Sequence, residues 1–182
     1  MKKVFLGILS VFFGLGLSFA KSYSIDYTHT ASDFEVKHFT ITKVRGTFDK
    51  IEAKVDAEND GTINSIEGII NSDTLDTRNA DRDKHMKSED FLSTKNYKTI
   101  TFKSTKITDD KVYGILTIKG ISKQIELDLT KDKIAHPRTG RAVYALELNG
   151  KINRLDFNVG KSISNAVISN EVKLHVIIEA YE

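Results

Sequence analysis

The sequence predicts an all-β protein, an antiparallel barrel or sandwich of about eight to ten strands with one short helical insertion. Apolar and polar residues alternate with a period of two in most segments between residues 33 and 178, which is typical of strands with one buried and one solvated face. Turn-forming sequences, such as Glu-Asn-Asp-Gly at residues 58–61, separate these segments. Only the stretch from Thr77 to Thr105 breaks the alternation with a helical pattern.

Taken in order, the alternating segments place their apolar side chains on one face of each strand. In the first segment Phe34, Val36 and His38 point one way, while the residues between them are charged. Gly68, inside the third segment, indicates a bend or a close approach of another chain segment. The predicted strands are residues 33–39, 51–55, 66–70, 99–103, 112–118, 124–130, 142–148, 152–157 and 172–178.

The helical insertion has a recognisable start. Thr77 or Asn79 can cap a short helix, and Asp81 and Asp83 lie in its first turn, where the helix dipole favours acidic groups. A second short turn begins at Ser88. We expect the apolar side chains of this insertion to close or line one end of the barrel, because a short amphipathic segment must bury its apolar face. These side chains are Met86, Phe91 and Leu92.

The first twenty residues are typical of a secretory signal peptide. Two Lys residues precede an apolar run at residues 4–17, and Ser-Phe-Ala at residues 18–20 resembles a cleavage site. A membrane anchor is the alternative, but the run is shorter than the roughly 20 residues that a spanning helix needs. We therefore expect residues 1–20 to be removed and residues 21–182 to form one periplasmic or secreted domain. The chain has no Cys, so disulfides are excluded.

Composition and motifs exclude several classes of function. Two of the 27 Lys and Arg residues lie in the predicted signal peptide, so the remainder carries 25 positive and 25 negative residues. This balance gives no reason to expect nucleic acid as a partner. The chain has no Gly-x-Ser-x-Gly, His-Glu-x-x-His, phosphate-binding loop or dinucleotide fingerprint. We therefore predict that it is not an enzyme and that it needs no cofactor.

A series of short motifs in a fixed order resembles a known family. The motifs are Tyr23-Ser24-Ile25-Asp26 with His29-Thr30, Phe34-x-Val36-x-His38, Val44-x-Gly46-x-Phe48, Arg82-Asp83-x-His85-Met86, Asp90-Phe91, Thr101-Phe102-x-Ser104-Thr105, Gly114-x-Leu116-Thr117-Ile118-x-Gly120, Arg154-x-Asp156-Phe157 and Asn170-Glu171-Val172. Over nearly its whole length the chain from residue 21 resembles the YceI-like family of secreted, lipocalin-like proteins. The resemblance implies an extended antiparallel β-barrel of about eight strands whose long internal pore holds a polyisoprenoid or another long-chain amphiphile, such as a fatty acid or fatty amide.

The interior of such a barrel could be filled or open. An eight-stranded barrel is wide enough either to be filled by its own side chains or to hold one small ligand, and the inward positions, which are mostly aliphatic with several Phe, fit both. If a lipid is held there for transport, storage or sequestration, the expected lining is Phe34, Val36, His38, Phe48, Met86, Phe91, Phe102, Leu116, Ile118, Leu127, Tyr144, Leu146, Phe157 and Leu174.

Four polar residues are expected at the rim, where a head group would lie: Arg82, Asp83, His85 and Asn158. A structural role is the alternative for two of them, since Arg82 and Asp83 could tie the helical insertion to the barrel by hydrogen bonds. Asn158 follows Phe157 where the family usually has Gly, and Asn tolerates the left-handed backbone of a turn.

Two other functions stay open at this point. A metal site is an alternative if His29, His38 and His85 converge near one rim, although no metal is predicted. A protein-interaction module with a filled barrel is the other, because long strands and the outward-facing Ile177 allow a homodimer. The apolar run at the N-terminus is the only one in the chain, so we expect no stable membrane span.

Overall fold

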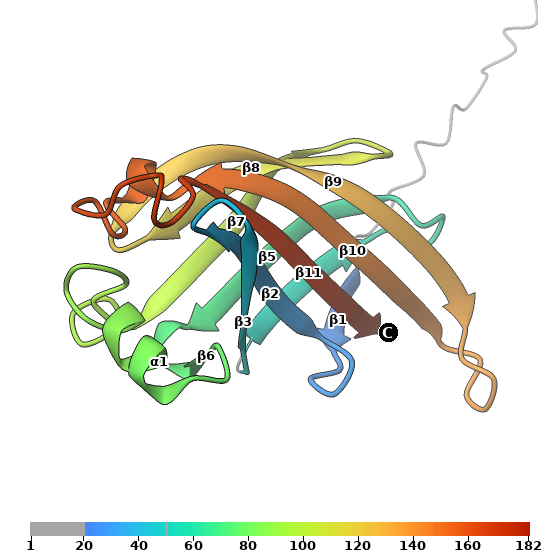
Figure 1. Ribbon diagram of the computed structural model, residues 1–182. Helices are drawn as coiled ribbons and strands as arrows, with labels where there is room; N and C mark the ends of the chain where they lie inside the picture. Colours follow the sequence, from blue (N-terminus) through green and yellow to red (C-terminus); the bar gives the residue numbers. More distant parts are fainter. Residues whose placement is uncertain (1–20, 50) are drawn as a thin grey trace, which may run out of the picture.

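Eight antiparallel strands close into a barrel in the computed structural model, which describes residues 21–49 and 51–182 (Figure 1). The all-β barrel prediction is thereby confirmed. The predicted signal peptide lies outside the described residues. The order around the barrel is β1 Lys21–Ile25, β4 Ile51–Ala57, β5 Ile63–Asn71, β7 Thr99–Ile107, β8 Lys111–Ile118, β9 Ile121–Ala135, β10 Ala142–Asn153 and β11 Glu171–Tyr181, and β11 returns to β1.

Strand β11 is shared between the barrel and a side sheet. Its last residues pair with β1, through Ser24 and Tyr181, whereas residues 173–177 pair with β2. The side sheet continues from β2 to β3 and β6, and the β3–β6 pair Phe48–Leu75 leads into helix α1. The barrel wall therefore divides along β11. The side sheet consists of β2 Ala31–His38, β3 Thr42–Phe48 and β6 Leu75–Asp76.

Helix α1, Ala80–Met86, begins as predicted at Asn79, whose side-chain Oδ1 accepts a hydrogen bond from the backbone N–H of Arg82 at 2.9 Å. Turns follow it up to Asn96, and the 3-10 helix η1, Ser72–Thr74, precedes it. Figure 1 places α1 at the same end of the barrel as the long connection between β10 and β11. None of the described helices is long and apolar enough to span a membrane.

One predicted strand is wrong, and one of the two interpretations of Gly68 is contradicted. Residues 152–157 do not form a separate strand: β10 ends at Asn153, and Arg154–Phe157 forms the 3-10 helix η2. The side chain of Asn153 accepts the backbone N–H of Leu155, and Asn158 closes the turn in the left-handed conformation with φ 53°, so local hydrogen bonds outweigh the alternation. Gly68 makes no close approach, since an added Cβ would meet no heavy atom within 4 Å.

The interior of the barrel has a packed end and a hollow end. The packed end is a buried apolar cluster around Tyr23, Val55, Tyr144 and Leu146. The rings of Tyr23 and Tyr144 meet edge to face with their centroids 4.8 Å apart, and the Tyr144 hydroxyl donates to the carbonyl of Glu58. The hollow end lies toward α1, where a second cluster that includes Phe48, Leu116 and Phe157 surrounds a cavity.

Candidate ligand-binding cavity

The hollow end contains an apolar cavity of about 550 Å³. An apolar cavity of about 150 Å³ already accommodates a benzene molecule, and pockets of about 300–1,000 Å³ are typical for small-molecule ligands. The cavity is therefore large enough for a ligand of many carbon atoms. Its wall is built by inward residues of β2–β5, β7–β11 and α1 and by the two long connections at that end.

Strand alternation and glycine together keep this end hollow. On β5, the inward residues are Ile66, Gly68 and Ile70, so the middle position contributes no side chain. On β3, Gly46 lies opposite Phe34, and a Cβ added to Gly46 would lie 2.5 Å from Cζ of that ring. The missing side chain lets the Phe34 ring lie against the neighbouring strand. The aromatic ring thus covers the wall and leaves the centre of the barrel free.

Most of the predicted lining surrounds the cavity. The residues that do so are Phe34, Val36, His38, Phe48, Met86, Phe91, Phe102, Leu116, Ile118, Leu127, Phe157 and Leu174. Tyr144 and Leu146 do not line it, because their strand continues past the hollow end and places both side chains in the packed cluster, where each is 1% exposed. Alternation identifies an inward position but does not say how far along the barrel that position lies.

Many lining residues were not among the predicted set. The alternation in the sequence identifies most of them as inward residues. It does not show which inward residues contact a cavity. Leu92 was expected at this end and does line it. The other main additions are Ser32, Val44, Ile51, Ala53, Ile66, Ile70, Ile100, Ile125, Leu148, Ile152, Val159, Ile168, Val172, Val176 and Ile178.

Helix α1 contributes Asp81, Arg82 and His85 to the polar part of the lining. The other polar lining residues are Ser32, His38, Thr101 and Arg154. The Arg82 side chain donates from Nε to Thr77 Oγ1 at 2.7 Å and from Nη2 to the Thr77 carbonyl at 2.6 Å. Its Nη1 has no hydrogen-bond partner among the described residues. A ligand group that accepts hydrogen bonds can therefore be bound at Arg82 without breaking these contacts.

Two of the predicted rim residues have structural roles instead. Asp83 does not line the cavity, and its Oδ1 accepts hydrogen bonds from the backbone N–H and the hydroxyl of Thr77. This carboxylate ties α1 to β6, as the alternative interpretation expected. Asn158 lies behind the cavity wall, where it ends η2. Hydrogen bonds to Thr77 hold the Asp83 carboxylate away from the cavity, whereas Asn158 is exposed and shapes the turn through its backbone.

Arg154 is a buried cation that the sequence analysis did not single out. Its guanidinium donates to five backbone carbonyls, and no carboxylate among residues 21–49 and 51–182 pairs with it. Burial lowers the pKa of this side chain below its usual value. Because the five carbonyls all belong to the connection between β10 and β11, Arg154 holds that segment over the hollow end. The acceptors are Val159, Gly160, Ile163, Ile168 and Ser169.

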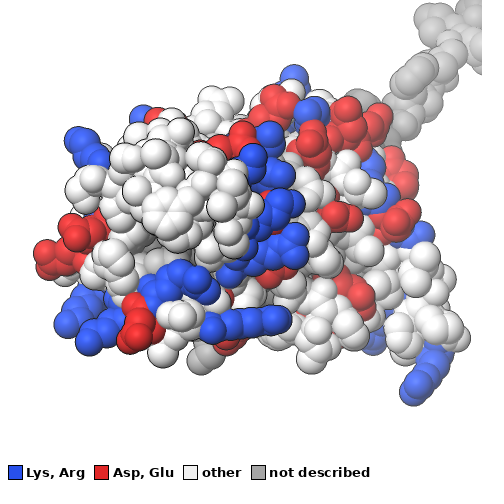
Figure 2. All heavy atoms as spheres, in the orientation of Figure 1, with Lys and Arg blue, Asp and Glu red and all other residues white. Residues whose placement is uncertain are grey.

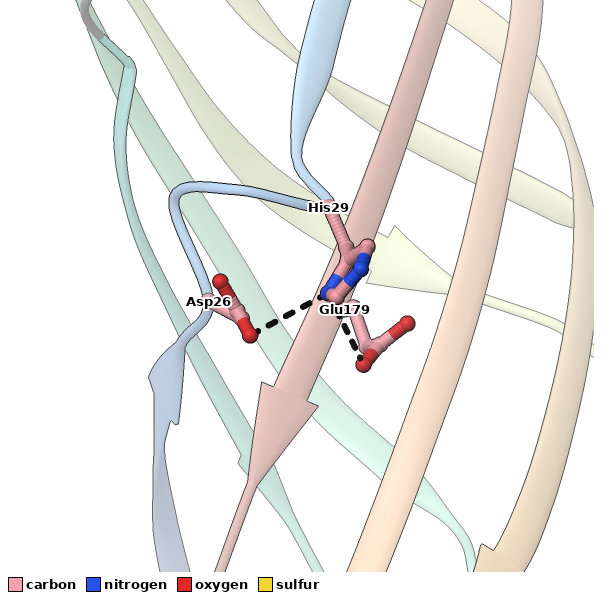
Figure 3. A group of neighbouring side chains, drawn as sticks. All are labelled: Asp26, His29 and Glu179. Atoms are coloured by element: carbon pink, nitrogen blue, oxygen red, sulfur yellow. Dashed lines mark hydrogen bonds and ion pairs between the residues drawn. The ribbon is translucent and has the colours of Figure 1, made fainter.

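The three histidines considered as metal ligands do not converge. His38 and His85 line the cavity, whereas His29 lies in the turn between β1 and β2, against β11 (Figure 3). Its Nδ1 is 3.2 Å from Asp26 Oδ2 and 3.6 Å from Glu179 Oε1. Among residues 21–49 and 51–182, Asp26, His29 and Glu179 form the only group of three or more side chains spaced to share a metal ion.

The Asp26–His29–Glu179 cluster is explained by its own hydrogen bonds. Asp26 Oδ1 accepts the backbone N–H and the hydroxyl of Thr28, and these bonds lower the pKa of the Asp26 carboxyl. The Tyr181 hydroxyl donates to Glu179, which raises the pKa of Tyr181 to about 12. The cluster thus joins the β1–β2 turn to β11, at the place where the barrel closes.

Comparison with known proteins identifies the family. The family model described as a YceI-like domain matches residues 23–180. The chain belongs to the YceI-like family. The UPF0312 protein SAB2563 of Staphylococcus aureus is 32% identical to this YceI-like chain over 165 residues, which are 87% of this chain and 96% of that protein.

Solved structures of similar proteins share the fold of this YceI-like chain. The Campylobacter jejuni YCEI protein has a TM-score of 0.74 and 32% identity, and the match covers 80% of this chain and 89% of that one. Burkholderia cenocepacia BcnA has a TM-score of 0.75 and 21% identity, with 86% and 99% covered. A polyisoprenoid binding domain from Saccharophagus degradans has a TM-score of 0.63 and 15% identity, with 87% and 97% covered. At the two lower identities, the likeness concerns the fold alone.

Proposed function

We propose that this YceI-like protein is a non-enzymatic binding protein that holds one long-chain amphiphilic lipid in its hollow end, for transport, storage or sequestration in the periplasm or outside the cell. The observation that carries the proposal is the apolar cavity of about 550 Å³, whose lining includes polar side chains of α1 at the hollow end. The similar fold of a domain described as polyisoprenoid binding supports a lipid as ligand. The signal-peptide pattern of residues 1–20 supports export.

The arrangement of the cavity suggests how the lipid is oriented. The tail extends along the aliphatic wall toward the packed cluster, where Leu127 and Ile178 belong to both regions. The head group lies near Arg82 and His85, where the Nη1 of Arg82 can donate to a carboxylate, amide or hydroxyl oxygen. Burial of ten methylene groups would contribute roughly 8 kcal/mol at about 0.8 kcal/mol each, before the costs of association. Micromolar binding needs about 8 kcal/mol net, so a longer tail and the head-group contacts must offset the cost of association.

Displacement of a fluorescent fatty-acid probe tests the proposal. Polyprenols, fatty acids and fatty amides of graded length are titrated against the bound probe. We expect affinity to rise with chain length and then reach a plateau, because the cavity has a finite length. If none of these lipids displaces the probe, and zinc instead binds stoichiometrically and is lost in His29→Ala, the lipid proposal must be abandoned for a metal-binding one.

A variant that fills the cavity makes the test specific. Gly68→Leu places a side chain in open space within the cavity wall, where an added Cβ would meet no atom within 4 Å. It should weaken lipid binding by about tenfold or more, because the tail loses room, while the protein stays folded. Ile69→Leu, on the next residue of β5, points outward and serves as the control. Equal binding by both variants would show that the lipid lies elsewhere.

A further inference from the structure

The turn between β2 and β3 exposes two large apolar side chains side by side. Phe39 is 56% exposed and Ile41 is 83% exposed, the highest value for a large apolar residue in the described part of the chain. Single exposed apolar side chains are common and need no explanation. Two at the tip of one hairpin form an apolar tip, which we define as residues 39–41, and such features mark interaction sites.

The backbone of the apolar tip adopts a left-handed conformation that Phe and Thr do not favour. Phe39 and Thr40 both have positive φ, at 48° and 60°. Tight hairpin turns require this conformation and are usually built from Asn and Gly, which tolerate it. An aromatic residue here is therefore unfavourable for folding. Strain of this kind occurs at functional positions.

The apolar tip is held firmly beside the cavity. The Phe39 backbone N–H donates to the carbonyl of Val167 at 2.9 Å, and His38 pairs with Ile168 in an isolated β-bridge. His38 and Ile168 both line the cavity. Since adjacent strand residues are about 3.3 Å apart, the tip begins one residue from the cavity wall. A surface bound by the tip is therefore next to the hollow end.

Positive side chains lie directly behind the apolar tip. Lys37 on β2 and Lys43 on β3 are opposite each other in the β2–β3 register, where like charges repel. Lys43, Arg45 and Lys173 share a single carboxylate, that of Glu35. Positive charge is thus in excess at this place even though the chain beyond the predicted signal peptide is balanced.

The space-filling view shows how charged and uncharged residues are distributed at this end of the molecule. In Figure 2, an uncharged area covers the end of the molecule where the β2–β3 turn and the β10–β11 connection lie in Figure 1. Lys and Arg side chains border this area on two sides, and Asp and Glu side chains lie at other parts of its edge. Phe39 and Ile41 lie at this end, and two apolar side chains with cations beside them match the interface of an anionic bilayer. The apolar side chains would reach the acyl chains, and the cations would reach the phosphates.

We propose that the apolar tip docks the protein on an anionic lipid bilayer. Phe39 and Ile41 enter the bilayer interface, Lys37 and Lys43 contact lipid phosphates, and the hollow end faces the membrane from which a lipid enters or to which it returns. A protein partner fits less well, because a tip of three residues is far smaller than the roughly 1,000 Å² that a stable protein interface buries. This inference rests on the proposed lipid-binding function.

Sedimentation with vesicles tests the docking. The protein without the predicted signal peptide is mixed with vesicles of phosphatidylcholine alone or of equal parts phosphatidylcholine and phosphatidylglycerol. We expect binding to the anionic vesicles that falls as salt is added. The double variant Phe39→Ser with Ile41→Ser should bind about tenfold or more weakly. Tyr27→Ser with Ile134→Ser is the matched control, since both residues are similarly exposed but lie outside the tip, and it should bind as the original protein does.

A fluorescence measurement locates the contact. The chain has no Trp, so Phe39→Trp introduces a single reporter. Its emission should shift to the blue on addition of anionic vesicles, whereas an Ile134→Trp reporter should not respond. Unchanged binding by the double tip variant, or equal binding of the original protein to both kinds of vesicle, would overturn the docking proposal. So would a dimer in solution that the tip variant abolishes, because the tip would then bind a second copy.

The two proposals can fail independently. The double tip variant should still bind the fatty-acid probe in solution as tightly as the original protein, because its substitutions lie outside the cavity lining. Its transfer of the probe to anionic vesicles should be slower. If the original protein docks on vesicles but binds no probe, the lipid-binding function fails and the docking stands. If it binds the probe but not the vesicles, only the docking fails.

Discussion

The packed end and the hollow end of the barrel are built from the same strands, yet their interiors differ. Around Tyr144, the ring of Tyr23 packs edge to face against the Tyr144 ring, and buried apolar side chains fill the interior. Near α1, Gly68 contributes no side chain and Gly46 lets the Phe34 ring lie against the wall. The difference shows that a hollow interior depends on where small residues stand among the large ones.

Replacing Arg154 should have the largest effect, because it tests what keeps the hollow end covered. Arg154→Met leaves five backbone carbonyls without their donors. Each unsatisfied buried carbonyl costs about 1–3 kcal/mol, so we expect a loss of about 4 kcal/mol or more in the free energy of unfolding. Hydrogen exchange should rise first in residues 159–170. Arg154→Lys keeps the charge but not the planar fork and should restore only part of the loss; full rescue would contradict this role.

A pair of identical substitutions compares the two ends directly. Leu146→Ala at the packed end should cost close to the upper limit of the range of about 2–5 kcal/mol for buried Leu, because its side chain is surrounded by atoms. Leu116→Ala at the hollow end should cost about 2 kcal/mol less, since one side of Leu116 already faces the cavity. Urea unfolding measures both values. Equal losses would mean that the cavity is collapsed in solution.

A second pair tests how glycine opens the cavity. Gly46→Ala places a Cβ against the Phe34 ring and should push it inward, which costs about 1–3 kcal/mol and weakens probe binding. Gly68→Ala adds the same atom where nothing lies within 4 Å, and it should stabilise the strand by about 0.5–1 kcal/mol. Thermal unfolding and probe titration report both effects. Unchanged stability and unchanged probe binding in Gly46→Ala would contradict the proposed role of Gly46.

The smallest effect is expected on the outer surface, which belongs to neither end. A hydrogen bond from Arg45, together with Lys43, lowers the pKa of the Glu35 carboxyl. A lowered pKa in the folded state stabilises the protein above the pKa of the unfolded state, about 4.3, and this contribution is lost as the pH falls through the folded value. Glu35→Gln should therefore destabilise the protein slightly at neutral pH and not at about pH 3. A difference that persists in acid would point to a lost hydrogen bond instead of a lost charge.

Much of the fold could be predicted from the sequence, because strand alternation and turn chemistry are local. The period of two correctly placed Phe34, Leu116 and Leu174 toward the interior, and the capping pattern located α1 at Asn79. The family motifs identified the barrel. The strand predicted at residues 152–157 failed because a local turn around Asn153 and Asn158 outweighs the alternation.

Only the tertiary structure decided which inward residues meet a cavity and which meet one another. Leu146 and Leu116 look alike in the sequence, but one lies in the packed cluster and the other beside the cavity, because packing depends on the strands opposite and on their register. Arg154 could not be assigned a role for the same reason, since its partners are backbone carbonyls that come together only when the β10–β11 connection folds. The docking role proposed for the apolar tip likewise depends on tertiary structure, because it rests on the cations of the neighbouring strands and on the cavity behind the tip.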